Sequence, residues 1–78
     1  MRLKGKLACV EFWDHVINDK VPMRCQAFGR IIKNHSKYIV LCSWDVLDGD
    51  AATVEANREI ITIIKSTIIK LEVAYTKN

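Results

Sequence analysis

The clearest hydrophobic pattern in this 78-residue chain is a pair of isoleucine-rich runs in its last third, residues 60–64 and 68–74. Three residues, Lys65-Ser66-Thr67, separate the runs, and neither the runs nor the link contain proline or glycine. Isoleucine and threonine are restricted at χ1 and favour the pleated sheet. Three residues are too few for a crossover, so the pattern predicts two strands joined by a tight turn. An isoleucine-rich helix over 59–72 is the main alternative, and its many β-branched residues argue against it.

A second pattern covers residues 23–33, where apolar or small residues alternate with largely polar ones. This alternation is typical of a strand with one buried face. The first set is Met23, Cys25, Ala27, Gly29 and Ile31, and the polar set is Arg24, Gln26 and Arg30. Gly29 lies in the middle of the run and predicts a sharp bend, which a barrel needs where one strand serves both of its sides.

Shorter apolar stretches at 7–13 and 38–44 predict two more strands. Pro22 closes the loop after the first strand, and residues 34–36 form a tight connection. The acidic stretch 45–58 is expected to be a loop with a helical turn near 50–52, with Asp50 as its N-cap. The chain is therefore predicted to be one all-β domain, residues 1–78. We expect a small, strongly bent five-stranded barrel with strands four and five at its outer edges.

Composition and charge add expectations about partners. Half of the residues are hydrophobic, which is high for a chain near the lower size limit of a domain, so part of the apolar surface is expected at a subunit interface. The net charge is only +3, but it is unevenly distributed. Residues 20–37 carry five basic residues and no acid, whereas residues 45–59 carry five acids against Arg58 alone. This separation indicates a side that faces a polyanion, or complementary edges in a ring, as alternatives to two solvated surfaces.

Nothing in the chain indicates catalysis, a metal site or a cofactor. Cys9, Cys25 and Cys42 are odd in number and widely spaced, and each lies in a predicted strand, where a free thiol acts as a small hydrophobe. Trp13-Asp14-His15 is a weak acid–base candidate, because neighbouring strand residues point to opposite faces. Because no catalytic set of residues can be assembled, we expect a non-enzyme. No signal core or membrane-spanning run is present, so we expect a cytoplasmic protein.

The order of strands resembles the Sm-like small β-barrel family. In the second half of that family's signature, Lys65 stands for the arginine, Ser66 for the glycine and Thr67 for the third turn residue, and an isoleucine-rich strand follows. The first half is similar from Gly29 to Leu41, with the glycine and the apolar positions at matching spacing. The chain departs from the family where an Asp and a Met-Asn are usual, since it has Ser36, Tyr38 and Ile39 there.

This resemblance implies a homo-oligomeric ring of five to seven subunits, in which strand four of one subunit pairs with strand five of the next. It also implies single-stranded RNA binding by the loops between strands two and three and between strands four and five. The corresponding interface residues are Ile61, Ile63 and Ile68. The corresponding RNA-binding residues are Lys33, Asn34, His35, Lys37, Tyr38, Lys65, Ser66 and Thr67. Ile39 replaces the amide that usually reads a base, so the family's uridine specificity does not carry over to this chain from the resemblance.

The chain also resembles small phage-encoded and mobile-element proteins. Val10-Glu-Phe-Trp-Asp14 and the run from Ile61 to Ile69 match the beginning and end of their outline. That resemblance implies an accessory barrel for protein interaction, with no nucleic-acid ligand. The two functions stand as alternatives, and an ordinary polar turn at 33–38 is the plainest interpretation of the loop residues.

Overall fold

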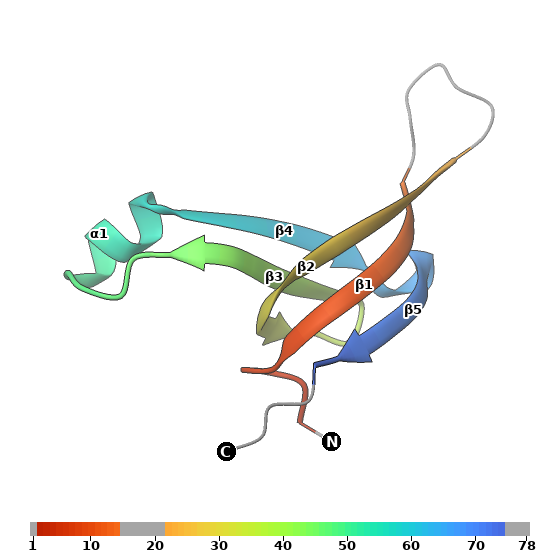
Figure 1. Cartoon of the computed structure of the whole chain (residues 1–78), viewed down its shortest axis with the longest axis horizontal. Helices are drawn as coiled ribbons and strands as arrows, with labels where there is room; N and C mark the ends of the chain where they lie inside the picture. The colour runs from red at the N-terminus through yellow and green to blue at the C-terminus, as the bar shows by residue number, and fades with distance from the viewer. Residues whose placement is uncertain (1, 15–21, 75–78) are drawn as a thin grey trace.

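The computed structural model describes residues 2–14 and 22–74, and these form a single curved antiparallel sheet with one short helix at its side (Figure 1). Two of the loops that connect the strands contain a helical segment. The elements are β1 (Leu7–Asp14), β2 (Met23–Asn34), β3 (Tyr38–Asp45), α1 (Ala51–Ala56), β4 (Arg58–Ile64), the 3-10 turn η1 (Lys65–Thr67) and β5 (Ile68–Val73).

The five strands lie in the order β4-β3-β2-β1-β5, and every neighbouring pair is antiparallel. The sequence prediction of an all-β domain with strands four and five at the edges is therefore confirmed. The sheet is not closed: β4 and β5 are consecutive in the chain, yet they are its two open edges, joined only through η1.

The core lies on the inner face of the curved sheet. Val10, Ile31, Ile39 and Leu41 are fully buried there, and Ile63 of β4 is 2% exposed. Because side chains alternate across a strand, one residue in two of β1 points inward: Ala8, Val10 and Phe12. Burying each large aliphatic side chain contributes about 1.5–3 kcal/mol, which makes this small cluster the main source of cohesion.

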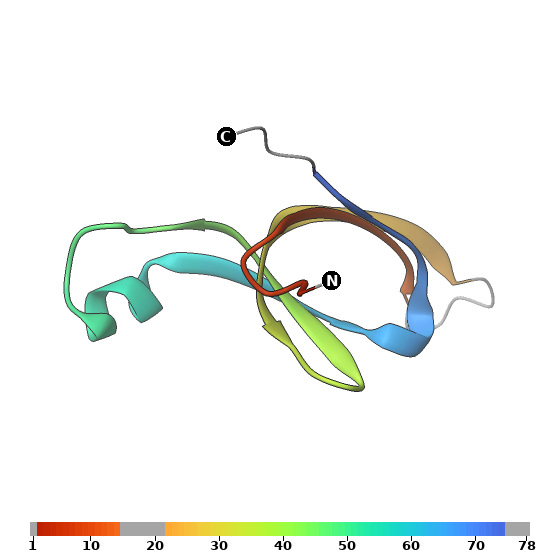
Figure 2. The same ribbon diagram turned by 90° about the horizontal axis from the view of Figure 1, so that it is seen from below.

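The sheet is strongly curved, so that β1 and β2 arch over the core (Figure 2). Gly29 lies within β2, where a Cβ atom would lie 2.7 Å from the carbonyl oxygen of Cys42 in β3. The sequence predicted a sharp bend at this glycine, whereas the structure gives a different reason for it, which is the close approach of two backbones. Register shifts between Ile31 and Lys33, and between Cys42 and Trp44, add further bending, as β-bulges do.

Between β3 and β4 the chain forms an extension, residues 44–59, which we call the arm; it projects away from the rest of the sheet and carries α1 (Figures 1 and 2). The side chain of Arg30 donates to Asp45 across 2.7 Å at the base of the arm. As predicted, Asp50 is the N-cap of a short helix, and its carboxylate accepts from the backbone N–H of Thr53 at 2.8 Å. This hydrogen bond from Thr53 lowers the pKa of Asp50 below its usual value.

The predicted strands agree with the structure to within two residues at each end. The link 65–67, predicted as a tight turn, is a single 3-10 turn. All three cysteines lie in strands with free thiols, and only Cys42 is fully buried, while Cys9 and Cys25 are half-buried. His15, part of the weak acid–base candidate, lies outside the described residues.

Candidate functional site

The turn between β2 and β3 is held by hydrogen bonds that its own residues make. The backbone N–H of His35 donates to the carbonyl of Tyr38 at 2.9 Å. The backbone N–H of Lys37 donates to Nδ1 of the His35 ring at 3.1 Å, which fixes the ring against the turn. The turn is therefore an ordered structure although all three residues from His35 to Lys37 are exposed.

Two rings and an ammonium group are stacked beside this turn. The rings of His35 and Tyr38 lie parallel, with centroids 4.4 Å apart and 14° between their planes. The Nζ of Lys33 lies 5.3 Å from the centroid of the Tyr38 ring, within the range of a cation–π contact. Tyr38 is half-buried, so part of its ring stays accessible to solvent.

The second predicted loop is η1, and it touches the first. The backbone N–H of Lys65 donates to the carbonyl of Lys37 at 2.8 Å, which joins the two loops at their main chains. Within η1, the hydroxyl of Thr67 donates to the carbonyl of Ile64 at 2.6 Å and closes the turn. We call the joined residues 33–38 and 65–67 the loop platform.

The loop platform carries three lysines and no acidic residue. The structure brings Lys33, His35, Lys37, Tyr38 and Lys65 together through the hydrogen bonds and ring contacts given above. Asn34 and Ser66 are exposed on the same two loops, where their polar groups face solvent. The hydroxyl of Thr67 already donates to the carbonyl of Ile64, so it is the least available of these groups to a ligand. A surface of this composition has the groups that contact phosphates and stack on bases.

The three residues expected at a subunit interface differ in their surroundings. Ile61 is 39% exposed on the open edge strand β4, whereas Ile63 of the same strand is buried in the core. Ile68, at the start of β5, is half-buried and packs against the core cluster. Other isoleucines of the two edge strands are also exposed: Ile60, Ile64 and Ile69. Ile63 can therefore contribute to an edge contact only through its backbone.

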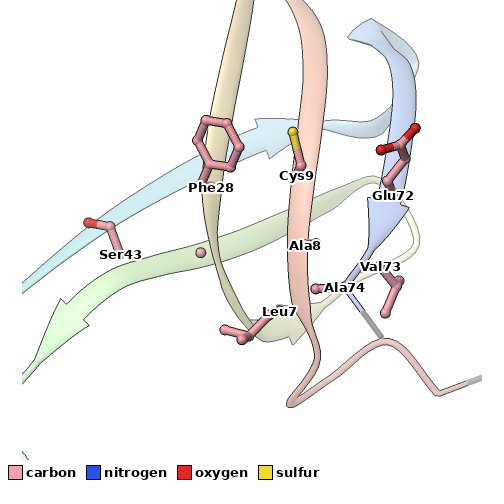
Figure 3. Close-up of a pocket in the computed structure, with 9 residues that line it drawn as sticks. Leu7, Ala8, Cys9, Phe28, Ser43, Glu72, Val73 and Ala74 are labelled. Carbon is pink, nitrogen blue, oxygen red and sulfur yellow. The ribbon is translucent and has the colours of Figure 1, made fainter. Parts of the chain in front are cut away.

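A second surface feature was not foreseen from the sequence. An open apolar hollow of about 570 Å³ lies on the outer face of the sheet, where β1, β2 and β5 run side by side (Figure 3). Its residues include Leu7 and Cys9 of β1, Phe28 of β2, Ser43 of β3 and Val73 of β5. The available signal was Phe28, a large apolar residue at a polar-face position of the alternating pattern in 23–33.

At the side of the hollow, Glu72 accepts from the ammonium of Lys70 at 2.6 Å on the exposed surface of β5. This hydrogen bond raises the pKa of Lys70 above its usual value. The pair is solvent-exposed and fixes two opposite charges next to each other, so β5 adds little net charge to the hollow.

Over residues 2–14 and 22–74, no three histidine, cysteine, aspartate or glutamate side chains are grouped as metal ligands would be. No helix in the same ranges has both the length and the apolar character needed to cross a membrane. Comparison with known proteins gave no matching family model, no similar curated protein and no similar solved structure.

Proposed function

We propose that this chain is a non-catalytic RNA-binding protein that holds single-stranded RNA on the loop platform. The observation that carries the proposal is the hydrogen bond from Lys65 to Lys37, since it unites the two loops that the resemblance implied for RNA. Through it, three lysines and the His35–Tyr38 stack belong to one continuous surface.

The chemistry of the loop platform suits an unpaired strand better than a duplex. Single-stranded RNA exposes both the phosphates and the faces of its bases, and binding proteins meet these with cations and aromatic rings. Lys33, Lys37 and Lys65 supply charge for phosphates, and Asn34 supplies an amide for a base edge. A base extends the existing stack of His35 on Tyr38, and Lys33 lies against the Tyr38 ring.

In this proposal the sheet is an Sm-like barrel and the chain forms a ring through its two edge strands. An open apolar edge is a site for pairing with another chain, and β4 and β5 both have exposed isoleucines beside their unpaired backbones. Pairing of β4 with β5 of the next copy covers both edges at once and sets the platforms of successive copies next to one another. The free thiols suit a reducing cytoplasm.

RNA binding is tested with a labelled single-stranded oligoribonucleotide and fluorescence anisotropy over a range of salt concentrations. Lys33→Ala with Lys65→Ala should weaken binding and flatten the plot of log affinity against log salt, by about 0.7 for each phosphate that the variant no longer neutralises. Lys70→Ala is the matched control: its lysine is paired with Glu72 outside the platform, so the slope should stay unchanged.

Tyr38→Ala should cost about 1–3 kcal/mol of binding free energy with the slope retained, because stacking does not release counterions. Tyr38→Phe should keep most of that energy, since the ring remains. Absence of binding to single-stranded RNA at low salt would refute the proposal.

The ring is tested separately by light scattering at micromolar concentration. Ile61→Gln with Ile69→Gln leaves the net charge unchanged and alters only exposed edge positions, so it should convert the assembly to smaller species while the far-UV circular dichroism stays the same. A wild-type monomer would contradict the ring.

The alternative is an accessory barrel for protein interaction, of the phage or mobile-element kind, with no nucleic-acid ligand. The apolar hollow with Phe28 favours it, because exposed apolar patches mark interaction sites. A chain that fails to bind RNA in the experiment above and keeps its hollow open to partners would fit this function.

A further inference from the structure

Beyond the strand pairs and the Arg30–Asp45 ion pair at its base, the arm has little support from the rest of its own chain. Leu47 at its tip is 86% exposed, and Trp44 near its base is 55% exposed. None of the six residues of α1 is buried. A helix of this length is far too short to be stable through its own hydrogen bonds and normally depends on packing. Leu47 and Trp44 therefore give the arm apolar surface that its own chain leaves exposed and that a partner can cover.

The hollow, like the tip of the arm, is an exposed apolar surface. Phe28 is 63% exposed, and Figure 3 shows its ring on the same side of the sheet as the thiol of Cys9. Leu7 and Val73 extend the apolar surface along β1 and β5. Ser43, which also lines the hollow, immediately precedes the arm, so each copy carries the hollow next to the base of its own arm.

We infer that two copies of this chain pair reciprocally, each placing Leu47 at the tip of its arm into the apolar hollow around Phe28 of the other. The arm projects away from the curved part of the sheet formed by β1, β2 and β5 (Figure 2), and these strands supply most of the hollow's residues, so the proposal takes the occupant from a second copy. A reciprocal pair uses both arms and both hollows and leaves neither surface open.

Charge complementarity favours this occupant over an unrelated apolar segment. Of the arm's five acids, Asp45 is paired with Arg30 of its own chain, and the other four are Asp48, Asp50, Glu55 and Glu59, with Arg58 as the arm's one basic residue. The segment that enters the hollow at Leu7 is basic, with exposed Arg2, Lys4 and Lys6 directly before it. The acidic tip of one copy therefore approaches the basic border of the other, which orients the arm as it docks.

The first test compares self-association by sedimentation equilibrium. Leu47→Asp removes the tip and Phe28→Asp removes the hollow; both positions are exposed, and circular dichroism checks that the fold is kept. Each variant should raise the dissociation constant of the pair about tenfold or more. A mixture of the two variants should associate better than either alone, because one arm and one hollow remain intact in the mixed pair.

The second test is a disulfide cross-link that replaces Leu47 by a smaller side chain of low polarity instead of a charged one. Leu47→Cys brings a thiol to the tip of the arm, and Cys9 already lines the hollow. With oxidised glutathione as oxidant, a covalent dimer should form through Cys9 and the new residue 47 thiol, identified by peptide mass mapping. Adding Cys9→Ser should abolish that dimer.

The pairing is distinct from the ring, which uses the edge strands. Ile61→Gln with Ile69→Gln should leave the Cys9 cross-link intact even where it breaks the ring. Loss of association in Phe28→Asp but not in Leu47→Asp would show that another segment fills the hollow and would overturn the inference. A wild-type chain that stays monomeric at high micromolar concentration, or a cross-link that joins only the new residue 47 thiols to each other, would overturn it as well.

Discussion

Replacing Gly29 by alanine tests whether the close approach of β2 and β3 is a structural requirement. A Cβ atom at this position would lie 2.7 Å from the carbonyl oxygen of Cys42 and 3.0 Å from its carbonyl carbon. Ordinary van der Waals contacts begin near 3.4 Å, so the strands would have to separate by about 0.7 Å. The obstacle is backbone of a neighbouring strand, which cannot rotate away as a side chain does.

Two opposing contributions determine the expected change in the free energy of unfolding. Inserting a methyl group into tightly packed structure typically costs about 1–3 kcal/mol. The φ angle of Gly29 is not positive, so alanine can adopt the same backbone conformation. Removing glycine then restricts the unfolded chain and stabilises the fold by about 0.4–1 kcal/mol. The net expectation is a destabilisation of roughly 1.5 kcal/mol, which in a domain of this size lowers Tm by about 6–12 °C.

The measurement is urea and thermal unfolding of Gly29→Ala against wild type, followed by circular dichroism. The sign of the change decides between the two contributions. A collision with Cys42 predicts a lower urea midpoint at unchanged slope, whereas a strand position with free space predicts a small increase in stability. An unchanged or higher midpoint would refute the close-approach argument.

Two other predictions concern single residues at the edge and in the arm. Ile63→Ala should lower the free energy of unfolding by about 2–5 kcal/mol, because the side chain of Ile63 is buried. Ile63→Lys should unfold the domain, as measured by circular dichroism, and a folded Ile63→Lys would place this residue outside the core. The lowered pKa of Asp50 means that its cap is fully present above the usual aspartate value and is lost as pH falls through the lowered value. Amide exchange at Thr53 should therefore speed up at acid pH in wild type beyond the intrinsic trend, and Asp50→Asn, which caps without titrating, should show only the intrinsic trend.

The strands were predictable because the forces that form them are local. The β-branched runs at 60–64 and 68–74, the alternation at 23–31 and the capping residue Asp50 each determine their own conformation through neighbours a few positions away. The edge positions of β4 and β5 were part of the predicted bent barrel and do not follow from local propensity, because a link as short as 65–67 is equally compatible with two neighbouring strands.

The candidate site was only partly predictable, because its geometry depends on contacts between distant segments. The residues of both loops were identified by resemblance, but the bond from Lys65 to Lys37 joins positions 28 residues apart and exists because β3 and β4 pair with Tyr38 opposite Ile64. The apolar hollow was missed because its residues come from four strands, and each of them is ordinary in its own segment. Closure of the sheet is likewise a long-range property, which no local pattern determines.

The low net charge of the chain links the RNA proposal to the ring proposal. A single platform offers three lysines, and each phosphate contact contributes modestly at physiological salt. Because η1 joins the two edge strands, pairing of β4 with β5 of another copy brings a second platform beside the first. Several platforms on one strand of RNA then act at high effective concentration. Ile61→Gln with Ile69→Gln should therefore weaken RNA binding as well as assembly, although it removes no positive charge and touches no residue of the platform. Unchanged affinity in the dissociated variant would show that one platform suffices and that the ring is not needed for binding.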